Sequence, residues 1–402
     1  MQQLIEEAAR LGKPAWRAML RYAAELHARN THPASAPFPY PWEEIGVGYF
    51  ASPAFGHWDL IHQIFDSIVS EPDHARHQLL NNLALQGADG HVPGTIWLYN
   101  DQVRWSTKVG NPPVWPVAVH EHYELHGDLS LIEACYVPLI RQIGWFESKR
   151  KADEEGYFYT DILNHSWESG IDDGVRYDSI RTGAFACIDA TCHVYQMYRY
   201  AGLWAELLGL RDESSGWSAR ADELGTFIRE ELYAEDAGFF YDSWSVRAPE
   251  LRRQTMDGMW PVVVGVASQE QADSVIDQYL LNPNRFFTAH PIPAVSLEDP
   301  GFELRMWRGP TWNSMTYWAA RGCARYGRTD AALRLLERAL DATADQFGRT
   351  GTVWEFYHPH GGEQTELKRK PYTEYNVPCR DYSGHNPAIA MARLWTDLQG
   401  AR

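Results

Sequence analysis

The chain has 402 residues, of which 45% are hydrophobic, so it can bury a large core. Its net charge of −17 disfavours binding to nucleic acid and to anionic membrane surfaces. The five cysteines form no CxxC pair, and no signal peptide, membrane-spanning run or phosphate-binding loop is apparent. We therefore expect a cytoplasmic protein with no disulfide framework, no metal site and no cofactor.

Helical periodicity recurs along the whole chain. Apolar residues that recur every three or four positions predict twelve helices. The segments Trp260–Ala267 and Asn386–Ala392 carry no charge, as expected of inner helices, whereas Arg334–Leu340 is amphipathic and predicts an outer helix. The expected helices are 2–29, 56–70, 73–85, 115–126, 130–150, 184–202, 214–233, 257–268, 269–281, 310–326, 329–347 and 385–397.

Short and long connections alternate between these helices. The shorter ones lie near 71–72, 127–129, 203–213 and 327–328, and structureless loops as long as the others are usually functional. In a ring of antiparallel helix pairs, all short turns share one face and all long loops share the other. We therefore predict an all-α fold, a single (α/α)6 barrel over residues 1–402. Its long loops are expected at 30–55, 86–114, 151–183, 234–256, 282–309 and 348–384.

The long loops are rich in aromatic residues. The chain has 17 tryptophans and 21 tyrosines, and many indoles fall outside the helical patterns. Because loops run over the surface, such indoles are expected to line a cleft, where flat rings can stack on sugars. Two loop segments, 156–159 and 238–242, also have the alternation of small hairpin arms.

Acidic residues stand among these aromatics at two distant places. Trp167–Asp173 reads WESGIDD, and Trp354–Tyr357 reads WEFY. Their loops are the third and the sixth, so Asp172 and Glu355 should face each other across the barrel mouth. Glycosidic bonds are usually cut by two carboxyl groups, and those of inverting enzymes stand about 6.5–9.5 Å apart. Asp172 is therefore the predicted general acid and Glu355 the predicted base, held ionised by hydrogen bonds or an arginine.

The choice of base stays open at this point, because three more acids lie in the same loop. They are Glu363, Glu366 and Glu374. The basic run Lys368–Lys370 of that loop is expected to be a solvated patch, although it could instead meet an acidic leaving group. Arg308, just before Pro310 at a predicted helix start, is expected to bind sugar hydroxyls or to steady an acid, or else to make a structural ion pair.

Several motifs together resemble the inverting α-glycosidases of glycoside hydrolase families 63 and 37, the processing-glucosidase, mannosylglycerate-hydrolase and trehalase group. The matches fall in order over about residues 55–385. They are Trp58-Asp59, Gly90-His91-Val92-Pro93, Asn111-Pro112-Pro113, Glu168-Ser169-Gly170-Ile171-Asp172 with Arg176-Tyr177, Trp307 to Trp312, and Glu355-Phe356-Tyr357.

This resemblance implies a set of sugar-binding residues around the two acids. The chain departs from the family pattern at Asn111, where glutamine is usual, and at Asp381–His385, which lacks the family's tryptophan. The implied residues are Tyr40, Trp42, Trp58, Asp59, Trp97, Asn111, Trp115, Trp167, Glu168, Gly170, Arg176, Trp307, Arg308, Gly309, Trp312, Tyr357 and His385.

The expected function is an inverting α-glycoside hydrolase that removes a terminal α-glucosyl or α-mannosyl unit from a disaccharide or a sugar–glycerate compound. A sugar epimerase on the same barrel is an alternative, and it would use paired histidines. A non-catalytic carbohydrate-binding protein is another. The sugar, linkage, leaving group and oligomeric state stay open. Histidines expected near the mouth are His57, His120, His122, His358 and His385.

Overall fold

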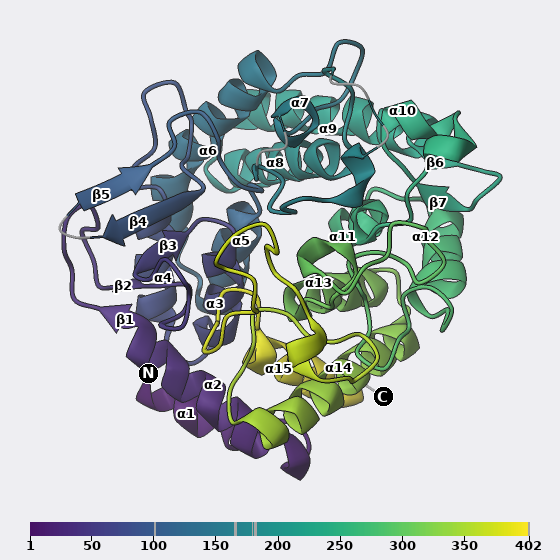
Figure 1. The fold of residues 1–402 in the computed structure, drawn as a ribbon. Coiled ribbons are helices and arrows are strands. Elements are labelled where there is room, and N and C mark those ends of the chain that lie inside the picture. The colour runs from purple at the N-terminus through teal and green to yellow at the C-terminus, as the bar shows by residue number, and fades with distance from the viewer. Residues whose placement is uncertain (100–101, 165–166, 179, 181–182, 401–402) are drawn as a thin grey trace.

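The structure, a computed structural model, describes residues 1–99, 102–164, 167–178, 180 and 183–400. Its helices form two concentric rings, which Figure 1 shows in a view into the barrel. The predicted (α/α)6 barrel is confirmed. In the described part of the chain, no helix combines the length and apolarity needed to cross a membrane.

The inner ring is the most deeply buried part of the molecule. Helix α3 contacts α5 and α15, α5 contacts α8, and α11 packs between α8 and α13. Every residue of α3 is buried, as are the residues of α11. The inner helices are α3 (Asp59–Ser67), α5 (Trp115–His126), α8 (Ile188–Leu207), α11 (Trp260–Val264), α13 (Asn313–Arg325) and α15 (Ala388–Gly400).

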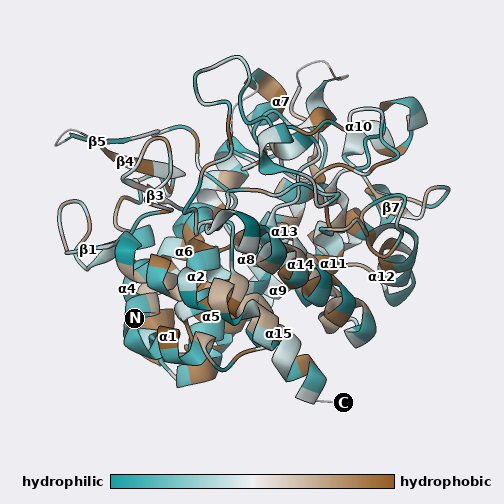
Figure 2. Ribbon diagram, turned by 60° about the horizontal axis from the view of Figure 1, so that its bottom comes forward, coloured by the Kyte–Doolittle hydropathy of each residue, from teal (hydrophilic) through white to brown (hydrophobic). Residues whose placement is uncertain are grey.

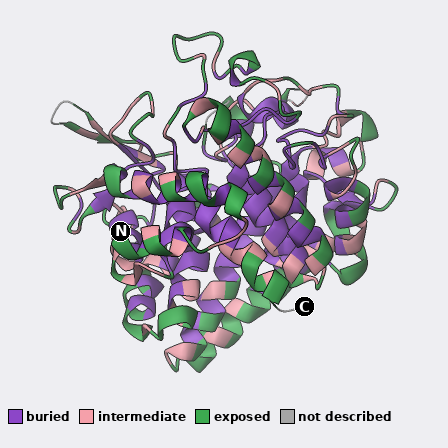
Figure 3. Ribbon diagram, turned by 90° about the horizontal axis from the view of Figure 1, so that it is seen from below, coloured by how far each residue is buried: buried purple, intermediate pink, exposed green. Residues whose placement is uncertain are grey.

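The outer ring covers the inner one with amphipathic helices. In Figure 3 these helices carry exposed residues outward, and the buried residues gather toward the middle. Thus α14 buries leucines against α13 and α15. The outer helices are α1 (Gln2–Ala8) with α2 (Arg17–Asn30), α4 (Pro72–Asn82), α6 (Leu129–Lys149), α9 (Arg211–Glu231), α12 (Gln269–Val275) with a π-helical turn at Ile276–Leu280, and α14 (Thr329–Thr350).

The long loops lie together at one end of the barrel, with short strands and two short helices among them (Figure 2). Among described residues, β3, β4 and β5 form an antiparallel sheet in which Trp97 stands opposite Ala54 and Arg104. The strands β6 and β7 pair as the predicted hairpin arm, whereas Tyr157 makes only an isolated bridge to Lys151. The remaining elements are β1 (Thr31–His32), β2 (Trp42–Glu43), β3 (Ala54–Gly56), β4 (Thr95–Tyr99), β5 (Gln102–Trp105), α7 (Asp161–Asn164), β6 (Tyr233–Ala234), β7 (Phe239–Phe240) and α10 (Ser243–Val246).

Several predicted helix boundaries differ from those in the structure. The helix predicted over 2–29 breaks after Ala8, because Gly12 has φ +61° and Pro14 starts a new turn. The helix predicted over 257–268 has only five α-helical residues, since Gly265 at φ +77° caps it. Helices α8 and α9 extend to Leu207 and from Arg211, so their connection is shorter than the predicted 203–213.

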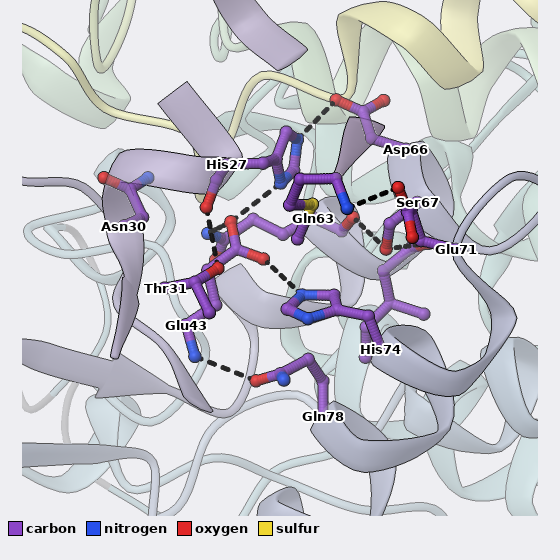
Figure 4. Close-up of polar contacts among 12 residues, drawn as sticks. His27, Asn30, Thr31, Glu43, Gln63, Asp66, Ser67, Glu71, His74 and Gln78 are labelled. Carbon is purple, nitrogen blue, oxygen red and sulfur yellow. Dashed lines mark hydrogen bonds and ion pairs between the residues drawn. The ribbon is translucent and has the colours of Figure 1, made fainter. Parts of the chain in front are cut away.

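A buried ionic network ties α2 to β2 and to the inner helix α3 (Figure 4). His27 lies between two carboxylates, 2.7 Å from Glu43 and 3.2 Å from Asp66, and all three side chains are buried. Burial alone would lower the pKa of His27, but the two carboxylates raise it to about 10. Gln63 of α3 donates to Glu43 at 2.7 Å, so this network anchors the segment that leads into the barrel mouth.

We predict that the His27 ring stays protonated well above its usual pKa. Because its pKa is raised on folding, the stability from this charge is present below about pH 6.5 and is lost as pH rises through about 10. Nitrogen-15 NMR of the histidine rings at pH 8 should show one imidazolium signal, which His27→Gln removes. The urea midpoint of the parent protein should fall between pH 7 and pH 9.5. A neutral His27 ring at pH 8 would contradict the prediction.

Candidate active site

A cavity of about 220 Å³ opens at the barrel end that carries the long loops. Both predicted catalytic acids line it, and so do residues at the starts of α3, α13 and α15. Its lining comprises Ile45, Tyr49, Phe50, Trp58, Asp59, Thr95, Trp97, Asn111, Trp167, Gly170, Asp172, Met306, Trp307, Trp312, Glu355, Arg369, Lys370, Tyr382 and His385.

A larger hollow of about 600 Å³ lies along the outer helix α14. It contains neither predicted catalytic acid, and its walls mix arginines with carboxylates, as at Arg334, Arg338, Glu337 and Asp341. The smaller cavity therefore holds the site chemistry, since it combines two acids with several indoles.

Asp172 sits on a loop that is pinned just before it. Glu168 is buried and accepts hydrogen bonds from Arg150 Nε at 2.7 Å and from the Thr160 amide at 2.8 Å. Ser169 donates through its amide and its hydroxyl to Asp161, at 3.0 and 2.8 Å. Burial raises the pKa of Asp161 to about 8. Glu168 was predicted to bind sugar. Its side chain instead fixes the loop through these hydrogen bonds.

The same loop is also pinned just after Asp172. Asp173 has φ +60° and pairs with Arg305, while its backbone oxygen accepts from Arg308 Nε at 2.9 Å. Arg308 also pairs with Asp178 at 2.6 Å. Arg308 does not line the cavity, and it makes the structural ion pair that the sequence allowed as an alternative to a sugar contact. Gly309, also outside the lining, lies so close to Glu303 that a Cβ would meet its backbone oxygen at 2.2 Å.

The carboxyl group of Asp172 reaches into the cavity, where it meets a cation. Lys370 Nζ lies 2.9 Å from Asp172 Oδ2, and both side chains keep 24% of their surface exposed. Behind this pair, Gly170 adopts φ +73°, and a Cβ there would lie 3.2 Å from Trp58 Nε1. Gly170 therefore lets the acid loop pass close to the indole at the start of α3.

Glu355 also lines the cavity, and its buried carboxyl group is paired with an arginine. Arg369 Nε donates to its two oxygens at 3.0 and 2.8 Å, and the Cys379 amide donates at 3.1 Å. The Glu355 amide in turn donates to the Cys379 oxygen at 2.9 Å. Both side chains of the Glu355–Arg369 pair are almost fully buried. This matches the expectation that Glu355 accepts hydrogen bonds or lies near an arginine.

Indoles form one wall of the cavity. Trp307 and Trp312 stack face to face, with ring centroids 3.6 Å apart and planes at 2°. His385 meets the Trp312 ring edge-on at 4.8 Å. Trp58 Nε1 is buried and has no hydrogen-bond partner among the described residues. An unpaired buried donor beside a cavity is costly unless a ligand completes it.

A third carboxyl group, that of Asp59, also lines the cavity. Asp59 accepts a short hydrogen bond from the Tyr382 hydroxyl, and His385 Nε2 lies 3.4 Å away. Burial raises the pKa of Asp59 to about 6, although the Tyr382 hydrogen bond opposes the shift. Burial also lowers the pKa of His385, whose Nδ1 contacts Ser314 Oγ at 2.7 Å. The pair can therefore donate and accept hydrogen bonds with sugar hydroxyls.

Arg176, predicted to bind sugar, lies in a separate buried cluster. Its guanidinium pairs with Asp189 at 2.6 Å, Asp242 at 2.7 Å and Asp257 at 3.3 Å. Burial raises the pKa of Asp242 to about 7 in spite of this cation. Ligand atoms of Cys187, Asp189 and Asp242 lie within 4.8 Å of one another, as a metal site would need. Arg176 already supplies the positive charge between the two aspartates.

Four further predicted contacts also fall outside the lining. Tyr40 stacks on His77 of α4, and Trp42 is buried against His32 and Phe38. Trp115 is buried, with its Nε1 bonded to Gln142 at 2.7 Å. The Tyr357 hydroxyl bonds to Asn386 at 3.0 Å, behind the wall that carries Glu355.

Sequence reasoning missed several residues that line the cavity, and the prediction for one segment was wrong. The run Lys368–Lys370 is not a solvated patch, since Arg369 is buried on Glu355 and Lys370 meets Asp172. The signal available in the sequence was that this run lies in the same predicted loop as Glu355. The other missed residues are Ile45, Tyr49, Phe50, Thr95, Met306 and Tyr382.

Residues 53–376 match the family described as mannosylglycerate hydrolase MGH1-like glycoside hydrolase domain. The chain is 24% identical to mannosylglycerate hydrolase MGH2 of Selaginella moellendorffii, over 83% of this chain and 78% of the plant protein. It is 26% identical to an uncharacterized protein of Borreliella burgdorferi, over 66% of this chain and 56% of that protein.

Solved structures share the fold over nearly the whole chain. The family 63 mannosylglycerate hydrolase of Thermus thermophilus, in complex with glucose, superposes with a TM-score of 0.70 at 20% identity. The alignment covers 96% of this chain and all of that one. The family match includes both acids of the cavity and the two cations beside them, Arg369 and Lys370. The chain therefore belongs to the mannosylglycerate hydrolase MGH1-like glycoside hydrolases of the family 63 type.

Proposed function

We propose that the protein is an inverting α-glycoside hydrolase that removes a terminal α-glucosyl or α-mannosyl unit from a short substrate. The observation that carries this proposal is the shared cavity of Asp172 and Glu355, distant in sequence and surrounded by indoles. Membership in a glycoside hydrolase family argues against the two alternative functions, a sugar epimerase and a non-catalytic carbohydrate-binding protein. Among the described histidines expected near the mouth, only His385 lines the cavity.

Asp172 acts as the general acid and Glu355 as the general base. Asp172 gives a proton to the glycosidic oxygen while the bond to the anomeric carbon breaks. Glu355 takes a proton from a water that attacks the anomeric carbon from the opposite face. Solvent then restores the proton to Asp172 and removes the one from Glu355. The net reaction adds one water to the glycoside and inverts the anomeric centre.

The surroundings of Glu355 suit a base. Arg369 and the Cys379 amide donate hydrogen bonds to its carboxylate oxygens, and a carboxylate can accept the proton of water. The competing acids of the same loop do not line the cavity. Glu363 and Glu366 are exposed and cap a short 3-10 turn, and Glu374 is also exposed. Glu355 is therefore the base among these four.

The stacked indoles and the Asp59 pair form the sugar subsite. The stacked indoles of Trp307 and Trp312 line the cavity, where they can pack on the apolar faces of a pyranose. Trp58 Nε1 is a donor that a hydroxyl oxygen can satisfy, and Asp59 with Tyr382 can hold a further hydroxyl. Relatives named mannosylglycerate hydrolases, one of them solved with D-glycerate, support a sugar–glycerate substrate or a disaccharide.

The stereochemical prediction is that the first sugar released has the opposite anomeric configuration. A panel of glucosylglycerate, mannosylglycerate, trehalose, kojibiose and nigerose should contain a substrate, and proton NMR at early times should show the β-anomer from it. Mutarotation then produces the α-anomer more slowly. Initial release of the α-anomer would contradict the assigned roles of the two acids.

Removing either acid should abolish turnover without unfolding the protein. Asp172→Asn and Glu355→Gln are expected to lower kcat by about 10²–10⁴-fold, the usual contribution of an acid–base group. Circular dichroism should be unchanged, and calorimetry should still detect binding of the sugar. Glu363→Gln is the matched control and should keep parental activity. Equal losses in Glu355→Gln and Glu363→Gln would reopen the choice of base.

Arg369 should keep Glu355 in the form that can accept a proton. Arg369→Met leaves a buried carboxylate without its cation, so Glu355 is expected to take up a proton and the acidic limb of the kcat profile to move to higher pH. The loss at pH 7 should be about 10-fold or more. Arg380→Met, which removes an exposed cation stacked on Trp354, is the control. An unshifted pH profile in Arg369→Met would refute this role.

A further inference from the structure

Two neighbouring cations meet the two catalytic carboxylates from one segment of chain. Arg369 pairs with Glu355, and Lys370 pairs with Asp172. The two pairs differ in burial: both members of the first are almost fully buried, whereas both members of the second keep 24% of their surface exposed. The first pair is thus built into the wall of the cavity, and the second faces its open space.

The chemistry of the two cations also makes the first ion pair fixed and the second exchangeable. The Arg369 guanidinium bonds to both Glu355 oxygens in a set geometry, and breaking that pair would strand a buried charge. Lys370 is a point charge on a flexible stem, and its ammonium group donates to Asp172 Oδ2. Lys370 can therefore exchange its partner at little cost.

The ion pair with Lys370 occupies the group proposed as the acid. Lys370 Nζ lies 2.9 Å from Asp172 Oδ2, whereas a general acid has to carry a proton and present it to the glycosidic oxygen. The other titratable groups near Asp172 are the carboxyl groups of Asp59 and Asp161, and Asp173 is already paired with Arg305 and Arg308. Lys370 is thus the cation that has to move.

We propose that Lys370 is an exchangeable counter-ion that reads the charge of the leaving group. On binding, a carboxylate of the substrate takes Lys370 from Asp172, and Asp172 takes up a proton from solvent. The charge around Lys370 is then unchanged, and the acid is ready to act. This inference rests on the proposed function and adds to it the residue that would distinguish an anionic leaving group from a neutral one.

The position of Lys370 suits that class of leaving group. Asp172 has to come within hydrogen-bond distance of the glycosidic oxygen to protonate it. In a glycoside of a 2-hydroxy acid, the carboxyl carbon is two bonds from this oxygen, so a cation that touches Asp172 can also reach that carboxylate. Among the described lining residues, the only other cation with a permanent charge is Arg369, whose Nε is bonded to both oxygens of the buried Glu355. A neutral leaving group offers Lys370 no new partner.

The test compares two substrates that differ in charge at one carbon: 2-O-α-glucosylglycerate and 2-O-α-glucosylglycerol, or the mannosyl pair if the enzyme prefers mannose. The parent enzyme should favour the anionic substrate by about 10- to 100-fold in kcat/KM, the usual worth of a charge-assisted contact. Lys370→Met should lose most of this preference by slowing the anionic substrate, while the neutral one keeps its rate or gains.

Lys368→Met is the matched control, because Lys368 lies two residues away, is exposed and does not line the cavity. It removes the same charge and should keep the parental preference. In Lys370→Met, the alkaline limb of the pH profile with the neutral substrate should also move to higher pH, since the cation that favours ionised Asp172 is gone. A residue that only shapes the loop would not produce this shift.

A binding experiment tests the exchange without turnover. In Asp172→Asn, Lys370 lacks its internal partner, so calorimetry with D-glycerate should show affinity at least about 10-fold tighter than in the parent. Adding Lys370→Met to that variant should remove the gain. Unchanged glycerate affinity in Asp172→Asn would overturn the exchange.

Two kinetic outcomes would also overturn it: an equal loss on both substrates in Lys370→Met, or a parent enzyme that does not distinguish them. Failure of the proposed function itself looks different, since the parent protein would then release sugar from neither substrate nor from the disaccharides.

Discussion

The need to compensate buried charge governs how this barrel mouth is built. The inner helices α3 and α11 are completely buried, so each carboxylate that the loops bring close to them has to find a cation or several donors. Glu355 has Arg369, Glu168 has Arg150, and the three aspartates around Arg176 share one guanidinium. Asp172 and Asp59 are compensated less completely, and both face the cavity.

The supports of the acid loop explain why several motif residues do not touch the cavity. Glu168 ties the loop to α6 through Arg150, and Asp173 ties it to the segment before α13 through Arg305 and Arg308. Arg176 fastens its far end to the starts of α8 and α11. A loop held on both sides keeps the Asp172 carboxyl in place although its own segment has little regular structure. Residues of one motif thus divide into those that act and those that position.

The asymmetry between the two cations fits the roles proposed for the two carboxyl groups. The proposed base has to start each cycle as a carboxylate, and a buried arginine pairs with it permanently. The proposed acid has to start each cycle protonated, so a permanent counter-ion would hinder it. A partly exposed lysine that can leave is consistent with that cycle.

The sequence by itself determined the helical ring, because alternating short and long connections between amphipathic segments have one compact solution. It also indicated the two acids, because acidic residues that stand among loop tryptophans on opposite sides of a ring are expected to face one cavity. Predicted helix boundaries were less accurate where a single glycine interrupts a helix. At Gly12 and Gly265 the left-handed backbone ends the helix, although the apolar pattern of the sequence continues.

Only the tertiary structure decided which polar residues face the cavity. Four residues cannot be told apart in the sequence, because each is a charged residue in a long loop: Arg176, Glu168, Arg369 and Lys370. Whether such a residue meets a substrate depends on partners far away in the chain, such as Asp242 for Arg176 and Asp172 for Lys370. Local pattern carries no record of those partners, because ion pairing across a barrel is set by how the helices pack and not by the spacing of residues along one loop.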